Sequence, residues 1–200
     1  MPHVDPKGMI PVVQKLKIKY KDLFHLKEYY IALHEWLLEN KWSDIDEGSD
    51  HWETHYRERI AQGGARELWF RWRVTKTPEG TPLQYYMDMD FHCLAIMDAE
   101  IIQDGKKIKL HSGEVELSIN AYIDKEYEKA FAKSNLLKQF IGIFNKRVYH
   151  KALEQRSKEL YQEVYSFQNY IKQWFKLKRY LPYDEARNFF PSVAYPSHLK

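Results

Sequence analysis

Apolar and polar residues alternate near the start of the chain and then change to a helical spacing. Residues 12–20 place apolar side chains on one face and lysines on the other, which predicts a half-buried strand. After Asp22, a favourable N-cap residue, apolar side chains recur every three or four positions to about Trp42. That spacing predicts an amphipathic helix. The acidic segment 43–50 that follows has the composition of a surface loop.

A period of two returns between His51 and Ile123 and predicts a meander of antiparallel strands. The first two strands flank Gly63 and Gly64, a pair typical of a hairpin turn. The strand that begins at Leu83 keeps its alternation far beyond the usual length of about 5–6 residues, so we expect a bulge or bend within it. Further turn signals fall at residues 78–82, 104–105 and 111–113.

Helical spacing dominates from Asp124 to about Lys178. The later part of this predicted helix carries one apolar seam, formed by Leu153, Leu160, Val164, Phe167, Ile171 and Trp174. Residues 181–200 are rich in proline and aromatic residues and are expected to form an extended tail. The element order predicts one α+β domain over residues 1–180, in which an N-terminal helix and a long C-terminal helix pack on an antiparallel sheet of about six strands.

Composition narrows the classes of partner. A chain of 200 residues can bury a sizeable core without disulfides. A formal net charge of +3 gives no concentrated basic footprint, so a nucleic-acid partner is not expected. The single cysteine, Cys93, falls on the apolar phase of its strand and is expected to be an unreactive core residue in a cytoplasmic protein. The sequence contains no run of about 18 apolar residues, so no transmembrane segment is expected.

The apolar phase of the strands collects large rings and methionines that face the helices. Such side chains can leave an adaptable pocket for an apolar molecule. The alternative is ordinary close packing of a core. The candidates for a ligand pocket are Trp52, Tyr56, Phe70, Trp72, Tyr85, Met87, Met89 and Phe91 from the strands and Phe140 and Phe144 from the helix.

The opposite phase forms a charged face of the sheet. Its basic side chains could bind a phosphate, and Asp88 and Asp90, two positions apart on one strand, could reach one divalent metal ion with His92 beside them. His51, Glu53 and His55 share the same predicted face. The alternative is a solvated surface with ion pairs between strands. The phosphate candidates are Lys17, Lys19, Arg57, Arg59, Arg71 and Arg73.

The order of strand, helix, meander and long terminal helix resembles the helix-grip arrangement of the START and polyketide-cyclase-like superfamily. The resemblance implies a curved sheet around the C-terminal helix and an apolar ligand between them. It rests on element order, and it departs from that family because one longer helix stands where two short helices are usual. An open sheet with the helix lying across it, without a cavity, is the alternative. The segments YKDLF, HEWLLENKW and DGKK also resemble small uncharacterised archaeal proteins, which implies no activity.

These patterns favour a non-catalytic binding module that holds an apolar small molecule. One alternative is a metal-dependent enzyme that acts on a phosphorylated or nucleotide substrate through the charged face. Another is a scaffold that forms a homodimer, or binds another protein, through the C-terminal helix or the tail. The cofactor is unknown from the sequence, and Walker, GxGxxG, HExxH and serine-elbow motifs are not found in it.

Overall fold

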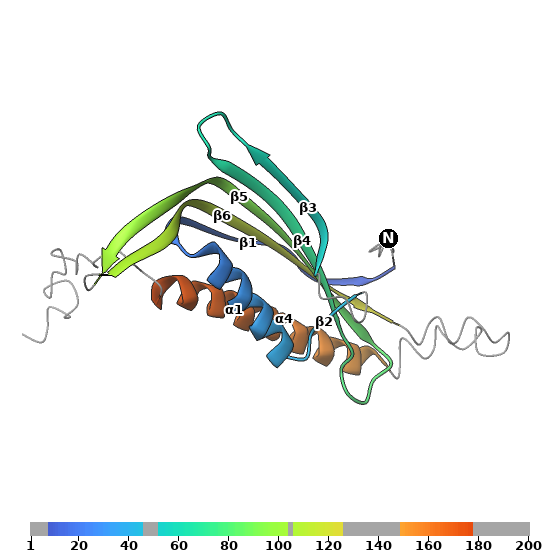
Figure 1. Ribbon diagram of the computed structural model, residues 1–200. Coiled ribbons are helices and arrows are strands. Elements are labelled where there is room, and N and C mark those ends of the chain that lie inside the picture. The colour runs from blue at the N-terminus through green and yellow to red at the C-terminus, as the bar shows by residue number, and fades with distance from the viewer. Residues whose placement is uncertain (1–7, 46–51, 104–105, 126–148, 178–200) are drawn as a thin grey trace, which may run out of the picture.

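The computed structural model describes residues 8–45, 52–103, 106–125 and 149–177 and confirms the predicted α+β class. Its helices lie on one face of an antiparallel sheet (Figure 1). The predicted tail, 181–200, lies outside the described residues. The elements are β1 (Ile10–Phe24), α1 (Leu26–Glu39), β2 (Ser43–Asp44), β3 (Glu53–Ile60), β4 (Arg66–Lys76), β5 (Gln84–Gln103), β6 (Lys106–Asp124) and α4 (Tyr149–Leu177).

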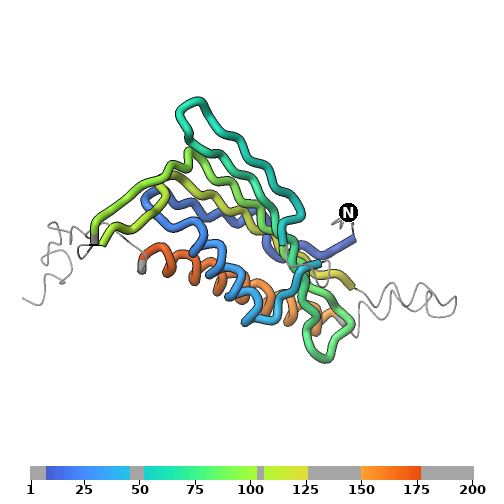
Figure 2. The backbone as a smooth tube through the Cα atoms, viewed as in Figure 1, coloured from blue at the N-terminus to red at the C-terminus, as the bar shows by residue number. Residues whose placement is uncertain are grey.

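The six strands form one open sheet in the order β1-β6-β5-β4-β2, and β3 pairs with another stretch of β4. α4 packs on β1 and β6, and α1 packs on α4. The tube view shows that the sheet curves over the two helices and that the β3–β4 hairpin extends beyond them (Figure 2). The two helices therefore leave part of one face of that hairpin uncovered.

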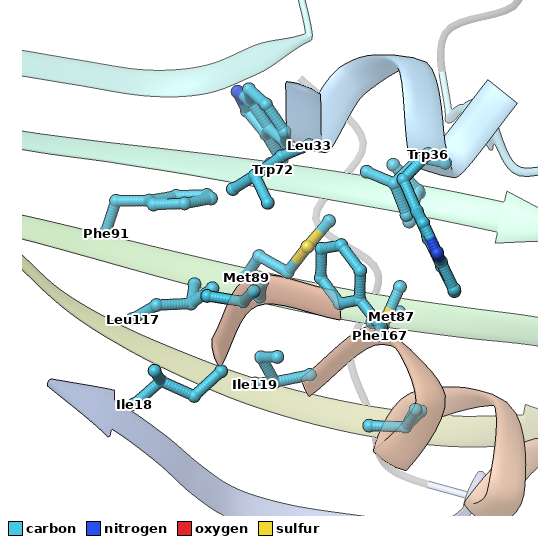
Figure 3. Close-up of a cluster of buried hydrophobic side chains, with 14 of the residues drawn as sticks. Ile18, Leu33, Trp36, Trp72, Met87, Met89, Phe91, Leu117, Ile119 and Phe167 are labelled. Carbon is cyan, nitrogen blue, oxygen red and sulfur yellow. The ribbon is translucent and has the colours of Figure 1, made fainter. Parts of the chain in front are cut away.

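The core fills the space between the helices and the apolar phase of the strands (Figure 3). Alternate residues of β4, β5 and β6 are buried, as their period of two predicts. The predicted seam of α4 is also confirmed, since Leu160, Val164, Phe167, Ile171 and Trp174 are all buried. Burial of this apolar surface is the main force that holds the long helix to the sheet.

Cys93 lies within this core and is fully buried. Burial disfavours the thiolate and raises the pKa of the thiol to about 12. We therefore expect no reaction with the thiol reagent 5,5′-dithiobis(2-nitrobenzoate) at pH 8 while the protein is folded, and complete reaction in denaturant. Absorbance of the released thionitrobenzoate measures both. Rapid reaction of the native protein would contradict the placement of Cys93 in the core.

α1 begins later than the sequence predicts. β1 pairs with β6 as far as Phe24, so Asp22 lies within the strand and is not the N-cap. His25 caps the helix instead, and its Nδ1 accepts a hydrogen bond of 3.1 Å from the backbone N–H of Glu28. After the helix, Ser43–Asp44 pairs with β4, where a surface loop was predicted.

A β-bulge in β5 confirms the predicted irregularity of this long strand. Ala95 has a positive φ of 52°, and the register with β6 shifts between Leu94 and Met97. The shift buries Ile96 and exposes Met97, which the simple alternation had placed in the apolar face. A second correction concerns residues 111–113, which were predicted to separate two strands. They lie inside the continuous strand β6.

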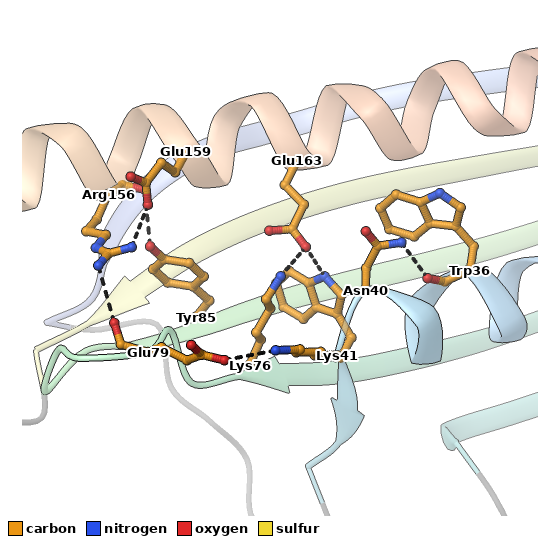
Figure 4. A network of polar contacts seen from close by, with 10 residues as sticks. Trp36, Asn40, Lys41, Lys76, Glu79, Tyr85, Arg156, Glu159 and Glu163 are labelled. Atoms are coloured by element: carbon orange, nitrogen blue, oxygen red, sulfur yellow. Dashed lines mark hydrogen bonds and ion pairs between the residues drawn. The ribbon is translucent and has the colours of Figure 1, made fainter.

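Polar contacts join α4 to the end of β4 beside the core (Figure 4). Glu163 of α4 accepts hydrogen bonds from Lys76 Nζ at 2.6 Å and from Trp42 Nε1 at 2.8 Å. Arg156, two turns earlier, donates to the backbone carbonyl of Glu79 at 3.3 Å. These contacts position α4 along its length in addition to the apolar seam.

Candidate functional site

The outer face of the sheet carries the predicted phosphate-binding residues, and most of them are ion-paired. Arg71 contacts Asp90, and Arg73 contacts Asp88 at 3.2 Å. Lys17 and Lys19 bind Glu116 and Glu114, each at 2.7 Å. Of the six candidates, only Arg57 and Arg59 lack an ion pair within the described parts of the chain. This arrangement favours the interpretation of the face as a network of cross-strand ion pairs.

The predicted metal ligands are each held by another side chain. Asp88 and Asp90 contact arginines, and His92 Nε2 lies 2.9 Å from Glu67 Oε1. A metal ion would have to displace these arginines from the carboxylates. In the described residues no group of three acidic, histidine or cysteine side chains is arranged to hold a metal ion.

The three residues predicted to share a face at the start of β3 do not do so. His51 lies outside the described residues. Glu53 pairs with Trp72 and His55 with Arg71, so Thr54 forms a bulge between them. The bulge turns Glu53 to the helix-facing side, where it meets Tyr30, while His55 stays on the outer face.

A shallow hollow of 380 Å³ remains on the outer face, over the middle of β3, β4 and β5. Trp69 stacks on His92 with a ring centroid separation of 5.1 Å, and the guanidinium of Arg57 lies 5.3 Å from the Trp69 ring centroid. The three side chains come from directly paired positions on neighbouring strands. Stacking across the strands therefore holds this row together.

Most of the predicted ligand-pocket residues are packed against one another in the core. Trp72, Met87, Met89 and Phe91 are at most 2% exposed. Phe91 stacks on Phe70 with centroids 4.3 Å apart, which is a close ring contact. Trp52 and Tyr85 are buried as well, and Phe140 and Phe144 lie outside the described residues. These buried side chains support the core alternative.

Tyr56 differs from the other candidates because its side chain is 58% exposed. It lies opposite Phe70 on the helix-facing side of the β3–β4 hairpin. The predicted side of the sheet is therefore right for Tyr56, and the prediction that Tyr56 is enclosed between the sheet and the helices is wrong. Tyr56 and Phe70 instead line an open groove beside the first turns of α1.

This aromatic groove has a volume of 280 Å³ and an apolar lining. Sequence reasoning identified two of its residues and missed the others, which come from the start of α1, from the bulge in β3, from β4 and from β6. The helical spacing predicted between Asp22 and Trp42 did carry a signal, since Leu26 and Tyr30 are four positions apart within it. The groove is lined by Leu26, Lys27, Tyr30, Glu53, Tyr56, Leu68, Phe70 and His111.

Two polar groups of the aromatic groove have defined hydrogen-bonding roles. The Tyr30 hydroxyl donates to the Glu53 carboxylate, and burial together with this contact raises the pKa of Tyr30 well above its usual value. His111 Nδ1 accepts from the backbone N–H of Leu26 at 3.4 Å. Burial, and then the nearby Arg66, lower the pKa of His111. At neutral pH the hydroxyl is thus protonated and the imidazole is uncharged.

No protein-family model, curated protein or solved structure matches the chain. Among the described residues, no helix has both the length and the apolar character required to cross a membrane.

Proposed function

We propose that this protein is a binding module and that its ligand is a small, largely apolar molecule held in the aromatic groove. The observation that carries the proposal is the groove itself, where Tyr56 and Phe70 meet the start of α1. Its volume is close to the lower end of the usual range for ligand pockets, about 300–1,000 Å³. Exposed aromatic surface at a concave site is typical of binding sites, because covering it with a ligand removes it from water.

The position of the groove modifies the expectation drawn from the helix-grip resemblance. That resemblance implies a ligand between the sheet and the C-terminal helix, whereas Leu160, Val164 and Phe167 of α4 pack into the described core. The aromatic groove lies between the sheet and the N-terminal helix. A relationship to the START superfamily remains a prediction.

A metal-dependent enzyme has weaker support than a binding module. The carboxylates that such an enzyme would use are those of Asp88 and Asp90, and both contact arginines. Self-association through β3, which forms part of a sheet edge, is also weakly supported. The strand has a bulge and carries charges on both faces, features that oppose edge-to-edge pairing.

Titration with the uncharged fluorescent probe N-phenyl-1-naphthylamine tests the proposed function. We expect saturable binding to the native protein and an affinity about 10-fold lower for Tyr56→Ala, because the variant loses one aromatic wall of the groove. Ile60→Ala is the matched control, since Ile60 is on the same strand, is 66% exposed and is not part of the lining. Absence of binding, or equal losses in both variants, would refute the proposal.

A further inference from the structure

Glu53 gives the aromatic groove a negative charge beside its rings. It lies at the end of β3, where the Thr54 bulge turns its side chain toward α1. We infer that the ligand of the groove is a small organic cation, an ammonium group attached to an apolar body, with the ammonium bound by Glu53. This inference rests on the proposed function and names the chemical class of its ligand.

Glu53 is the carboxylate in the lining of the groove. Its one hydrogen bond in the described structure comes from the neutral Tyr30 hydroxyl, through Oε1. No lysine, arginine or histidine nitrogen lies within 4 Å of the carboxylate in the described ranges, whereas Asp88, Asp90 and Glu116 each have such a partner. An ionised carboxylate has about four acceptor positions. The negative charge of Glu53 therefore has no cationic partner of its own in the described ranges and can face a cation in the groove.

Neighbouring rings hold two of the aromatic side chains of the groove in place. Tyr30 packs edge-on against Trp72, with centroids 4.7 Å apart, and this contact together with the bond to Glu53 fixes its orientation. Phe70 is held in a stack with Phe91. Tyr56 lines the groove beside Phe70, its partner across the two strands. Aromatic faces attract cations, and ammonium groups are recognised by clusters of such rings, most strongly where water is excluded.

Lys27 and His111 are the basic side chains of the lining. His111 is uncharged at neutral pH because burial lowers its pKa. Lys27 is exposed on the first turn of α1, where its ammonium group can remain in water. An anionic ligand would therefore meet one solvated lysine and the partly buried charge of Glu53. A cation meets the carboxylate and the rings together, so charge complementarity favours the cation.

Isothermal titration with two ligands of the same shape separates the inference from the proposed function. Benzyltrimethylammonium carries the charge, and neopentylbenzene is its neutral carbon isostere. We expect the native protein to bind the cation at least 10-fold more tightly than the isostere. Glu53→Gln, which keeps an acceptor for Tyr30, should remove that preference and leave binding of the isostere unchanged. Glu154→Gln, a change of the same type at an exposed position near the start of α4 and outside the groove lining, should have no effect.

The outcomes distinguish the two claims. Equal affinities for the two ligands, or a preference that survives in Glu53→Gln, would refute the cation and leave the apolar binding module standing. Binding of neither ligand to the native protein would refute both. Urea unfolding of Glu53→Gln confirms that the variant is folded, and 4-phenylbutyrate provides an anionic comparison that should bind more weakly than the cation.

Discussion

Replacement of Phe167 by alanine is expected to lower the free energy of unfolding by about 3–5 kcal/mol, the usual cost of removing a buried phenylalanine ring. Phe167 is fully buried in the middle of α4. Its ring packs on Trp36 of α1, with centroids 4.6 Å apart, and lies among Met87 and Met89 of the sheet (Figure 3). One substitution thus removes contacts of α4 with both α1 and the sheet, and it leaves a cavity.

Urea denaturation followed by tryptophan fluorescence measures this loss. Tyr161→Ala is the matched control, because Tyr161 is an aromatic residue of the same helix whose side chain is 45% exposed and whose described ring contact is with Tyr165. We expect the control to cost about 1 kcal/mol or less. Similar losses in the two variants would contradict the packing of the α4 seam against the sheet.

Much of the fold could be predicted from the sequence, because two spacings of apolar residues are unbroken in its regular elements. These are the alternation in the strands and the spacing of three or four positions in the helices. In β4, the residues Phe70, Trp72 and Val74 alternate with arginines, and they are buried as expected. In α4, the spacing from Leu160 to Trp174 matches one face of a helix. In both elements the apolar side follows from the spacing alone, because neither contains an inserted residue that changes the phase.

Bulges limit this reasoning, even in β5, where an irregularity was expected but its position was not. The insertions near Lys15, Thr54 and Ala95 each shift the register of a strand by an amount that the apolar pattern does not show. Lys15 and Ala95 have a positive φ, which is unusual for residues with a side chain. Such conformations depend on the partner strand. The inward turn of Glu53 is a direct result, and the candidate cation site depends on it.

The aromatic groove was missed for a different reason. Tyr56 has the phase of a core residue, but its exposure depends on how far α1 reaches along the sheet. α1 begins at Leu26 because β1 continues to pair with β6 up to Phe24. The uncovered part of β3 is therefore set by the length of a different pair of strands. The sequence around Tyr56 gives no information on how far β1 pairs with β6.

Gly113 is a residue whose role was misread as a turn and whose replacement should have a large effect. It lies within β6, opposite the bulge of β5. A Cβ atom at this position would lie 2.6 Å from Ile96 Cδ1, 2.9 Å from the carbonyl oxygen of Leu94 and 3.1 Å from that of Ala95. Two of these neighbours are backbone atoms of a paired strand, which cannot move without loss of ladder hydrogen bonds.

Gly113→Ala is therefore expected to lower the free energy of unfolding by about 1–3 kcal/mol, the usual range for overpacking. Gly63→Ala is the control, because a Cβ atom there meets nothing within 4 Å and the backbone is not in the left-handed region. That substitution should be neutral or stabilise the protein by up to about 1 kcal/mol, since it restricts the unfolded chain. Urea denaturation of both variants measures the difference. If Gly113→Ala were as stable as Gly63→Ala, the close approach of β6 to the Ala95 bulge would be contradicted.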